Sequence, residues 1–269
     1  MKVALQQNIA QFLLIGDDSK IDQEAKKAEL SLNHAGIRII HASSSEQAAR
    51  LAVQKVHADE AQVLMKGNVQ TKILLQEVLN KEYGLRTGRI LSHVGLFEIP
   101  NHHKLIMLTD CAMNLEPSIE EKAKITENAV FVARKIGIDI PKVAILAAVE
   151  VVNPKMAPTV DGALLTQMQR RGQIKDCIID GPLAFDNAIS KKSALEKGIQ
   201  SEVAGDADIL VVPNIETGNA LYKSFIYFAN AKVASIICGA KAPIALTSRT
   251  DTYESKLYSL VLSLLSAEI

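Results

Sequence analysis

The sequence predicts an α/β fold in which helices cover both faces of mostly parallel sheets. Short apolar runs, typical of strands buried on both faces, alternate with helical patterns along most of the chain. Polar residues gather where these runs end and helices begin, which is the edge at which such sheets bind ligands. The 269 residues suffice for one large domain or two small ones.

The first part of the chain alternates regularly between strand and helix. Strands are expected at residues 10–16, 37–40 and 62–65. Helices are expected at residues 21–34, from Ser44 or Ser45, and after Asn68. The residues expected to face inward are Ala48, Ala49, Leu51, Ala52 and Val56 in the second helix, and Ile73, Leu74, Val78 and Leu79 in the third.

A different pattern begins near residues 86–90, where we expect a change of domain. Residues 89–100 alternate in the manner of a long strand, and residues 104–108 suit its neighbour after a turn at 101–103. Ser118 and Glu121 then have the capping-box spacing of a helix that ends at Gly137.

The rest of the chain returns to the earlier alternation. Further strands are expected at residues 143–149, 176–180, 209–212, 232–237 and 242–246. Gly181-Pro182 is expected to break the second of these strands and Pro213 the third. Helices are expected at residues 160–171, from Ala220, and from about Tyr253, the last with Leu257, Leu260, Val261, Leu264 and Leu265 on one face.

Composition and missing motifs exclude several classes of protein. The 30 basic and 30 acidic residues cancel, so the net basic footprint of a nucleic-acid binder is missing. The longest apolar runs, such as residues 143–149, fall well short of the ~20 residues of a membrane helix. Cys111, Cys177 and Cys238 lack zinc spacing, which indicates reduced thiols in a cytosolic protein. Dinucleotide, P-loop, zinc-protease and α/β-hydrolase fingerprints are absent.

Polar residues at five strand ends are candidate ligand-binding residues. All are expected at the carboxyl ends of strands, where the unpaired N–H groups of a following helix favour anions. They are Lys66 and Gly67; Asp110; Asp180, Gly181 and Pro182; Asn214, Glu216, Gly218 and Asn219; and Ser248 with Arg249.

Ser248 and Arg249 form the sharpest of these signals. A hydroxyl beside a planar guanidinium matches a phosphate or carboxylate, so the pair predicts an oxyanion or phosphate cradle. The alternative is that Arg249 pairs with a surface carboxylate while Asp251 caps the last helix ahead of Glu254.

Each of the other candidates also has a structural alternative. Lys66 suits a strand end beside a turn, Asp110 the closure of its own loop, and Asp180 with Asp186 a turn and a helix cap. Cys111 is either a nucleophile or a buried small side chain. The adjacent His102 and His103 are either metal ligands or solvated turn residues.

Several segments together resemble the phosphate acetyl/butyryltransferase family. They occur in the family's order within a match from about residue 10 to 265, and they are Leu64–Gly67, Ile90–Val94, Leu108–Asn114, Val152–Met156, Asp180–Leu183, Gly205–Pro213, Glu216–Asn219 and Thr247–Arg249. Residues 91–94, 153–156 and 247–249 are more similar to the butyryl branch than to the acetyl branch.

The resemblance implies reversible transfer of a short acyl group, butanoyl or branched, between CoA and inorganic phosphate. These two are substrates, and no metal or permanently bound cofactor is implied. It also implies a cytoplasmic homodimer with the two-domain, three-layer α/β/α fold of isocitrate and isopropylmalate dehydrogenases. The domains would be residues 1–89 with 241–269 and residues 90–240, with the active site in the cleft between them.

The resemblance also assigns residues to roles. It adds Ser92, His93 and Asn153 to the expected binding residues and makes Ser248 and Arg249 the expected catalytic pair. The acetyl branch carries an aspartate base at the place of Ser255, so Asp251 is our candidate carboxylate here, with Glu254 or no base as alternatives. A family member is further expected to have one more strand–helix unit before Ala10.

Three alternatives remain beside the butyryl-type enzyme. The first is a phosphate acetyltransferase that uses acetyl-CoA. The second is a metal- and NAD-dependent dehydrogenase of the related fold, for which Asp206 and Asp208 are the close carboxylate pair, although at the wrong end of a strand. The third is a non-catalytic CoA-binding protein.

Overall fold

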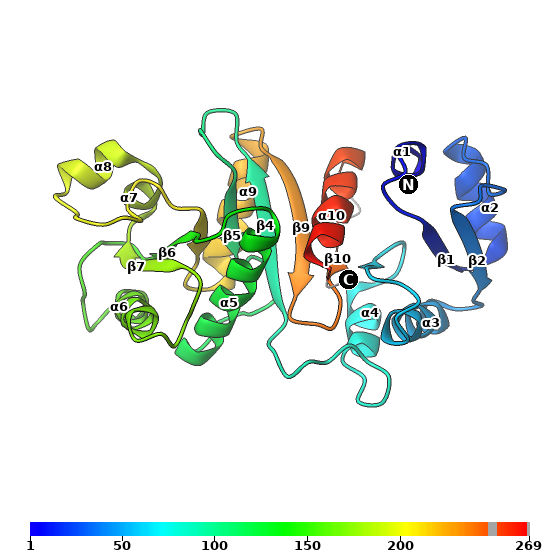
Figure 1. Ribbon diagram of the computed structural model, residues 1–269, viewed down its shortest axis with the longest axis horizontal. Coiled ribbons are helices and arrows are strands. Elements are labelled where there is room, and N and C mark those ends of the chain that lie inside the picture. The colour runs from blue at the N-terminus through cyan, green and yellow to red at the C-terminus, as the bar shows by residue number, and fades with distance from the viewer. Residues whose placement is uncertain (247–251, 268–269) are drawn as a thin grey trace. The chain divides into compact units, whose positions relative to one another are not determined.

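The computed structural model describes residues 1–246 and 252–267 (Figure 1). The chain divides into two compact units, Met1–Gly88 with Ala240–Ile269, and Arg89–Gly239. Gly88 and Gly239, the last residues before the chain passes from one unit to the other, both have positive φ. Only glycine adopts this conformation without strain, so both crossings need it.

The first unit contains two parallel pairs of strands. β1 (Phe12–Gly16) pairs with β2 (Ile37–His41), and β3 (Leu64–Met65) pairs with β10 (Ile244–Ala245). Its helices are α1 (Lys2–Gln6), α2 (Asp18–Lys27), α3 (Ser45–His57), α4 (Thr71–Val78) and α10 (Tyr253–Ser266).

Helix caps explain where these helices begin. Ser44 caps α3 by accepting a hydrogen bond from the Gln47 N–H, which confirms one of the two predicted caps. Asp17 caps α2 in the same way, so α2 begins three residues before the expected start and ends at Lys27. Thr252 caps α10 by accepting from the Ser255 N–H, and the alternative cap Asp251 lies outside the described residues.

The buried faces of three helices differ partly from expectation. Val53 is buried in α3 although it was not expected to be, and Leu79, which follows α4, is half exposed. On α10 the buried residues include Ser259 and Ser263, whereas Leu265 is half exposed. The two serine hydroxyls donate to carbonyls one turn earlier, which allows them to be buried without an unpaired hydroxyl.

The second unit is built around a mostly parallel sheet. Its strands are β4 (Ser92–Glu98), β5 (Ile106–Thr109), β6 (Lys142–Leu146), β7 (Ile178–Leu183), β8 (Ile209–Val211) and β9 (Lys232–Cys238), in the spatial order β9-β4-β5-β8-β6-β7. β5, β8, β6 and β7 run parallel, and β4 is antiparallel to both β5 and β9. The carboxyl ends of the parallel strands and of β9, and the start of β4, therefore share one edge, which we call the site edge.

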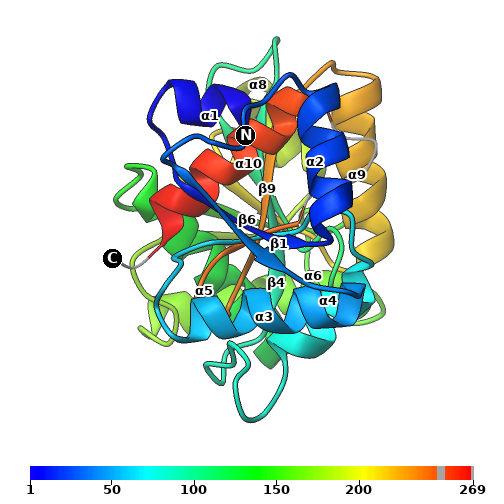
Figure 2. The same ribbon diagram turned by 90° about the vertical axis from the view of Figure 1, so that its right-hand side faces the viewer.

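Helices cover both faces of this sheet. They are α5 (Ile119–Lys135), α6 (Ala157–Arg170), α7 (Phe185–Ile189), α8 (Lys191–Glu196) and α9 (Ile215–Tyr227). Figure 2 shows α5 and α9 on opposite sides of the strands. Phe225 of α9 packs in a core cluster with Leu108 and Leu210 of the sheet. The capping box of Ser118 and Glu121 at the start of α5 is confirmed.

The predicted break at Gly181-Pro182 is wrong, because β7 runs through both residues to Leu183. β7 is the last strand in the order, so the N–H group that proline lacks is not needed by a further neighbour. The pairing with β6 also shifts register between Ala144 and Leu146, beside this dipeptide.

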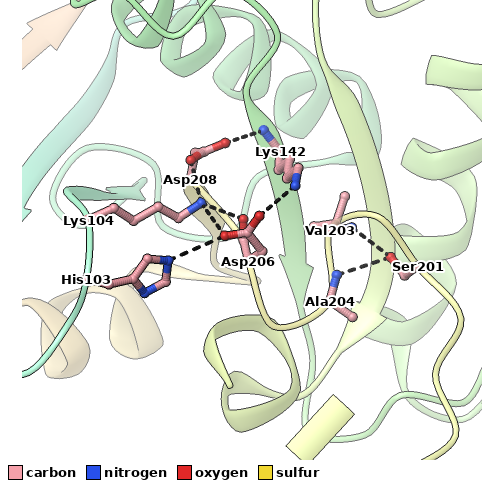
Figure 3. Close-up of polar contacts among 8 residues, drawn as sticks. All are labelled: His103, Lys104, Lys142, Ser201, Val203, Ala204, Asp206 and Asp208. Atoms are coloured by element: carbon pink, nitrogen blue, oxygen red, sulfur yellow. Dashed lines mark hydrogen bonds and ion pairs between the residues drawn. The ribbon is translucent and has the colours of Figure 1, made fainter. Parts of the chain in front are cut away.

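At the edge opposite the site edge, charged side chains form a network (Figure 3). Asp206 accepts from Lys142 Nζ at 2.6 Å and lies 3.0 Å from Lys104 Nζ and 3.5 Å from His103 Nε2. Asp208 accepts from Lys104 Nζ at 2.7 Å and from the Lys142 N–H at 2.7 Å. The carboxylates that the dehydrogenase alternative assigns to a metal are thus engaged by lysines.

This network predicts a pH-dependent contribution to stability. The hydrogen bond from Lys142 holds the pKa of Asp206 well below its usual range, so the stabilisation is present above the unfolded pKa of ~3.9 and is lost as the pH falls. Asp206→Asn is expected to lower the free energy of unfolding by about 2 kcal/mol at pH 7. In urea titrations from pH 7 to pH 3, the gap from wild type should shrink at low pH. Asp176→Asn, in an exposed pair with Arg134, is the control and should cost less than about 1 kcal/mol; a gap that stays constant with pH would contradict the account.

Candidate functional site

The site edge brings together the expected binding residues of the second unit. They come from the start of β4, the loops after β5 and β6, the last half of β7, and the N-cap and first turns of α9. They are Ser92, His93, Asp110, Asn153, Asp180, Gly181, Pro182, Asn214, Glu216, Gly218 and Asn219. Lys66 and Gly67 lie in the first unit, after β3. Ser248, Arg249 and Asp251 lie outside the described residues.

The Asp110 carboxylate closes its own loop. Its Oδ1 accepts from the N–H groups of Ala112 and Met113 at 2.9 and 3.0 Å, and its Oδ2 accepts from Asn114 Nδ2 at 2.6 Å. Asp110 is only 3% exposed. These contacts fit the structural alternative given for Asp110, because both carboxylate oxygens are engaged within the loop.

Helix α9 begins five residues earlier than expected, because Asn214 caps it. The Asn214 Oδ1 accepts from the Thr217 N–H at 3.0 Å and from its hydroxyl at 2.8 Å. Glu216 and Gly218 therefore belong to the first turns of the helix and not to a loop. The Gly218 N–H donates to the Asn214 carbonyl at 3.2 Å, within the first turn of the helix.

Gly218 allows the start of α9 to lie directly on the Asp110 loop. A Cβ atom here would lie 2.5 Å from the Asp110 carbonyl oxygen and 2.9 Å from the Cys111 Cα. The Ile215 N–H donates to the Leu115 carbonyl at 2.9 Å, which ties the two segments a second time. The start of α9 and the Asp110 loop are therefore packed directly against each other.

Ser92 and His93 at the start of β4 are almost completely buried. The Ser92 hydroxyl oxygen accepts from Asn128 Nδ2 at 2.8 Å, and the His93 carbonyl accepts from the Thr109 hydroxyl at 2.7 Å. The imidazole ring meets the Tyr222 ring edge-on at a centroid distance of 5.7 Å. These contacts fix the orientation of both residues beside the Asp110 loop.

The residues after β6 and in β7 order the segments next to α6. Asn153 Oδ1 accepts from the Lys155 N–H at 3.0 Å, and the Asn153 carbonyl accepts from the Thr159 hydroxyl at 2.9 Å. A Cβ atom on Gly162 of α6 would lie 2.8 Å from Pro182, so the helix packs closely on β7. Asp180 Oδ1 accepts from the Gly181 N–H at 2.9 Å.

The contacts of the remaining candidates fit the structural alternatives given for them. Burial raises the pKa of the Cys111 thiol well above its usual value, so this buried cysteine stays protonated and is a poor nucleophile. His102 and His103 lie in the turn between β4 and β5, and the described part of the chain holds no group of three or more metal-ligating side chains. In the first unit, Lys66 Nζ donates to the carbonyls of Gly67 and Val69 at 3.5 and 3.4 Å.

Sequence reasoning missed Glu150 and Asn128 as members of this edge, and it assigned no role to Asn114, the last residue of the strand-end segment 108–114. The strand before Glu150 was expected to run to residue 149 but ends at Leu146, which places Glu150 in the loop at the site edge. Its carboxylate accepts from Asn187 Nδ2 at 3.2 Å and from Lys197 Nζ at 3.1 Å. Its own N–H and the Lys197 ammonium lower the pKa of Glu150, so it is ionised at neutral pH.

Three helices contribute partial positive charge to the site edge. α5, α6 and α9 each follow a strand whose carboxyl end lies there, so their N-terminal ends face this edge. The N-terminal end of a helix carries a partial positive charge that favours anions. The arrangement therefore suits a ligand that carries negative charge.

Comparison with known proteins adds independent findings. Residues 42–264 match the protein family described as "Phosphate acetyl/butaryl transferase". The chain is 53% identical over 268 residues to a "Probable phosphate butyryltransferase" of Bacillus subtilis (strain 168), covering 100% of this chain and 88% of the relative. It is 48% identical over 218 residues to a "Phosphate acetyltransferase" of Thermotoga maritima, covering 81% of this chain and 74% of the relative.

A solved structure extends this similarity to the fold. The structure of a branched-chain phosphotransacylase from Enterococcus faecalis V583 superposes with a TM-score of 0.82 at 37% sequence identity. The superposition covers 95% of this chain and 98% of that chain. The similarity thus extends along nearly all of both chains.

Proposed function

Because this chain belongs to the phosphate acetyl/butaryl transferase family, we propose that it transfers a short acyl group reversibly between coenzyme A and inorganic phosphate. The observation that carries the proposal is the 53% identity to the B. subtilis relative over 268 residues, which spans every candidate residue at the site edge. The positive helix ends at that edge support it, because phosphate and the CoA phosphates are anions.

In this reaction a phosphate oxygen attacks the thioester carbonyl carbon, the C–S bond breaks, and the CoA sulfur leaves as a thiolate that takes up a proton. The phosphate must be held without losing its nucleophilic charge, and the carbonyl oxygen needs donors as it becomes an oxyanion. We assign phosphate binding to Ser248 and Arg249, since a guanidinium stays charged and forms two parallel hydrogen bonds. Asp251 is the proposed carboxylate for proton exchange with the thiol, with Glu254 in the first turn of α10 as the alternative.

Further properties complete the proposal. The acyl group is butanoyl or a short branched chain, the protein is a cytoplasmic homodimer, and neither a metal nor a permanently bound cofactor takes part. The fold is of the isocitrate/isopropylmalate dehydrogenase type, with domains 1–89 plus 241–269 and 90–240. No helix within the described ranges is long and apolar enough to cross a membrane.

A panel of acyl-CoA thioesters tests the proposal. Thiol release from C2 to C5 substrates, straight and branched, is expected to require phosphate and to be fastest with butanoyl or branched substrates. A preference for acetyl-CoA would select the acetyltransferase alternative. Absence of release from every thioester would overturn the proposal. Tight CoA binding without turnover would then favour a non-catalytic protein, and metal-dependent NAD reduction would favour a dehydrogenase.

A further inference from the structure

The carboxamide of Asn114 joins two segments of the site edge. Its Nδ2 donates to Asp110 Oδ2 at 2.6 Å and to the Leu91 carbonyl at 2.9 Å. Leu91 directly precedes β4, and Asp110 directly follows β5. A single side chain therefore connects the ends of two neighbouring strands at the place where the candidate binding residues gather.

The charge of Asp110 gives this contact its importance. A buried carboxylate at an edge that binds phosphate repels the substrate unless its charge is compensated and directed elsewhere. Backbone N–H groups of Ala112 and Met113 hold one oxygen, and the Asn114 side chain holds the other. Without the Asn114 amide, the second oxygen loses its short contact within the loop, and only the N–H groups of Ala112 and Met113 still hold the carboxylate, through its first oxygen.

We propose that Asn114 is a positioning residue for the acyl transfer, which keeps the Asp110 carboxylate turned into its own loop and away from the bound phosphate. The same amide holds the Leu91 carbonyl and thereby the start of β4, where Ser92 and His93 lie. This inference rests on the proposed function. Wild-type activity on the thioester panel tests that function separately, before any variant of Asn114 is compared.

Asn128 of α5 offers a matched control, because it contacts the same segment at the start of β4. Its Nδ2 donates to the Ile90 carbonyl at 3.0 Å and to the Ser92 hydroxyl oxygen at 2.8 Å, so it also makes a two-pronged contact just before and within β4. No carboxylate is among these partners. A loss of activity that reflects only the packing of this segment should therefore be similar for the alanine variants of both asparagines.

The first experiment compares Asn114→Ala with Asn128→Ala in steady-state kinetics. For Asn114→Ala, KM for phosphate is expected to rise about 10-fold while KM for acyl-CoA changes about twofold. The released carboxylate is proposed to lie beside the reacting phosphate, whereas the anionic groups of acyl-CoA are separated from its thioester by the pantetheine arm. For Asn128→Ala, the two KM values should change by similar factors. An equal change of both constants in Asn114→Ala, or none, would overturn the proposal.

The second experiment uses the pH profile, which a purely structural role would not change. In Asn114→Asp two carboxylates face each other, so the pair takes up one proton with a strongly raised pKa. A protonated Asp at 114 donates to Asp110 again. Activity relative to wild type is expected to fall about 100-fold at pH 8 and to recover at least about 10-fold by pH 6.

Other groups near this pair are accounted for by the control variant. The thiols of Cys111 and Cys238 have pKa values raised by burial and stay neutral in this range. His93 on β4 is present in both variants, and Asn128→Asp creates no carboxylate pair, because no carboxylate is among the partners of Asn128. Acid recovery in Asn114→Asp alone supports the proposal, and identical pH profiles of the two variants would overturn it, even if Asn114→Ala fails to fold.

Discussion

Replacing Arg249 with alanine is expected to lower kcat/KM for the phosphate-dependent reaction about 10³-fold, which is the scale of losing a charged, bidentate contact to a reacting anion. The guanidinium is proposed to hold phosphate while it attacks the thioester, so both ground-state binding and the transition state lose a partner. Circular dichroism and thermal melts should match those of wild type. The expected loss is therefore one of activity and not of folding.

Two further variants separate the roles of charge and geometry at Arg249. Arg249→Lys keeps the positive charge but loses the planar fork, so it should recover only part of the activity. Arg134 of α5 forms an exposed pair with Asp176. The kinetics of Arg134→Ala should stay within about twofold of wild type. Unchanged kinetics in Arg249→Ala would refute the assigned role.

Replacing Gly218 with valine is expected to lower the free energy of unfolding by about 3 kcal/mol and Tm by roughly 5–10 °C. A side chain at this position of α9 meets the Asp110 carbonyl oxygen at 2.5 Å and the Cys111 Cα at 2.9 Å. These are backbone atoms, so the helix or the loop must move as a whole. Activity should fall as well, because the Asp110 loop and the Asn214 cap shift together.

Differential scanning calorimetry of Gly218→Val and Gly67→Ala provides the comparison. Gly67 is another candidate site residue after a strand, but a Cβ atom there meets nothing within 4 Å and its φ is not in the positive range. Gly67→Ala should change stability by less than about 0.5 kcal/mol. A Gly218→Val protein as stable as Gly67→Ala would show that the helix start and the loop are not closely packed.

Sequence patterns predicted the elements whose signals are local. The capping box at Ser118 and the cap at Ser44 depend on residues three positions apart, and both are present. The end of β7 was misplaced because tolerance of Pro182 depends on β7 lying at the end of the strand order, which no local pattern reveals. The buried serines of α10 were missed because their hydroxyls are satisfied by the helix itself.

The candidate site was likewise predictable from the sequence only in part. Polar residues after strands identified the edge, because parallel strands bring their carboxyl ends together whatever their order. The partners of Asn114 were not predictable in full, since its amide donates both to Asp110 in the same loop and to the carbonyl of Leu91, which directly precedes β4. Glu150 was missed because an apolar run of residues 143–149 conceals the end of β6 at Leu146.

The most direct test of the central claim is the stoichiometry of the products formed from butanoyl-CoA and phosphate. Free thiol and acyl phosphate, the latter trapped with hydroxylamine, should appear in equal amounts, and thiol release should stop when phosphate is omitted. Thiol release that continues without phosphate, or that yields free carboxylic acid and no acyl phosphate, would mean that water and not phosphate attacks the thioester. That result would contradict the proposed phosphate acyltransferase.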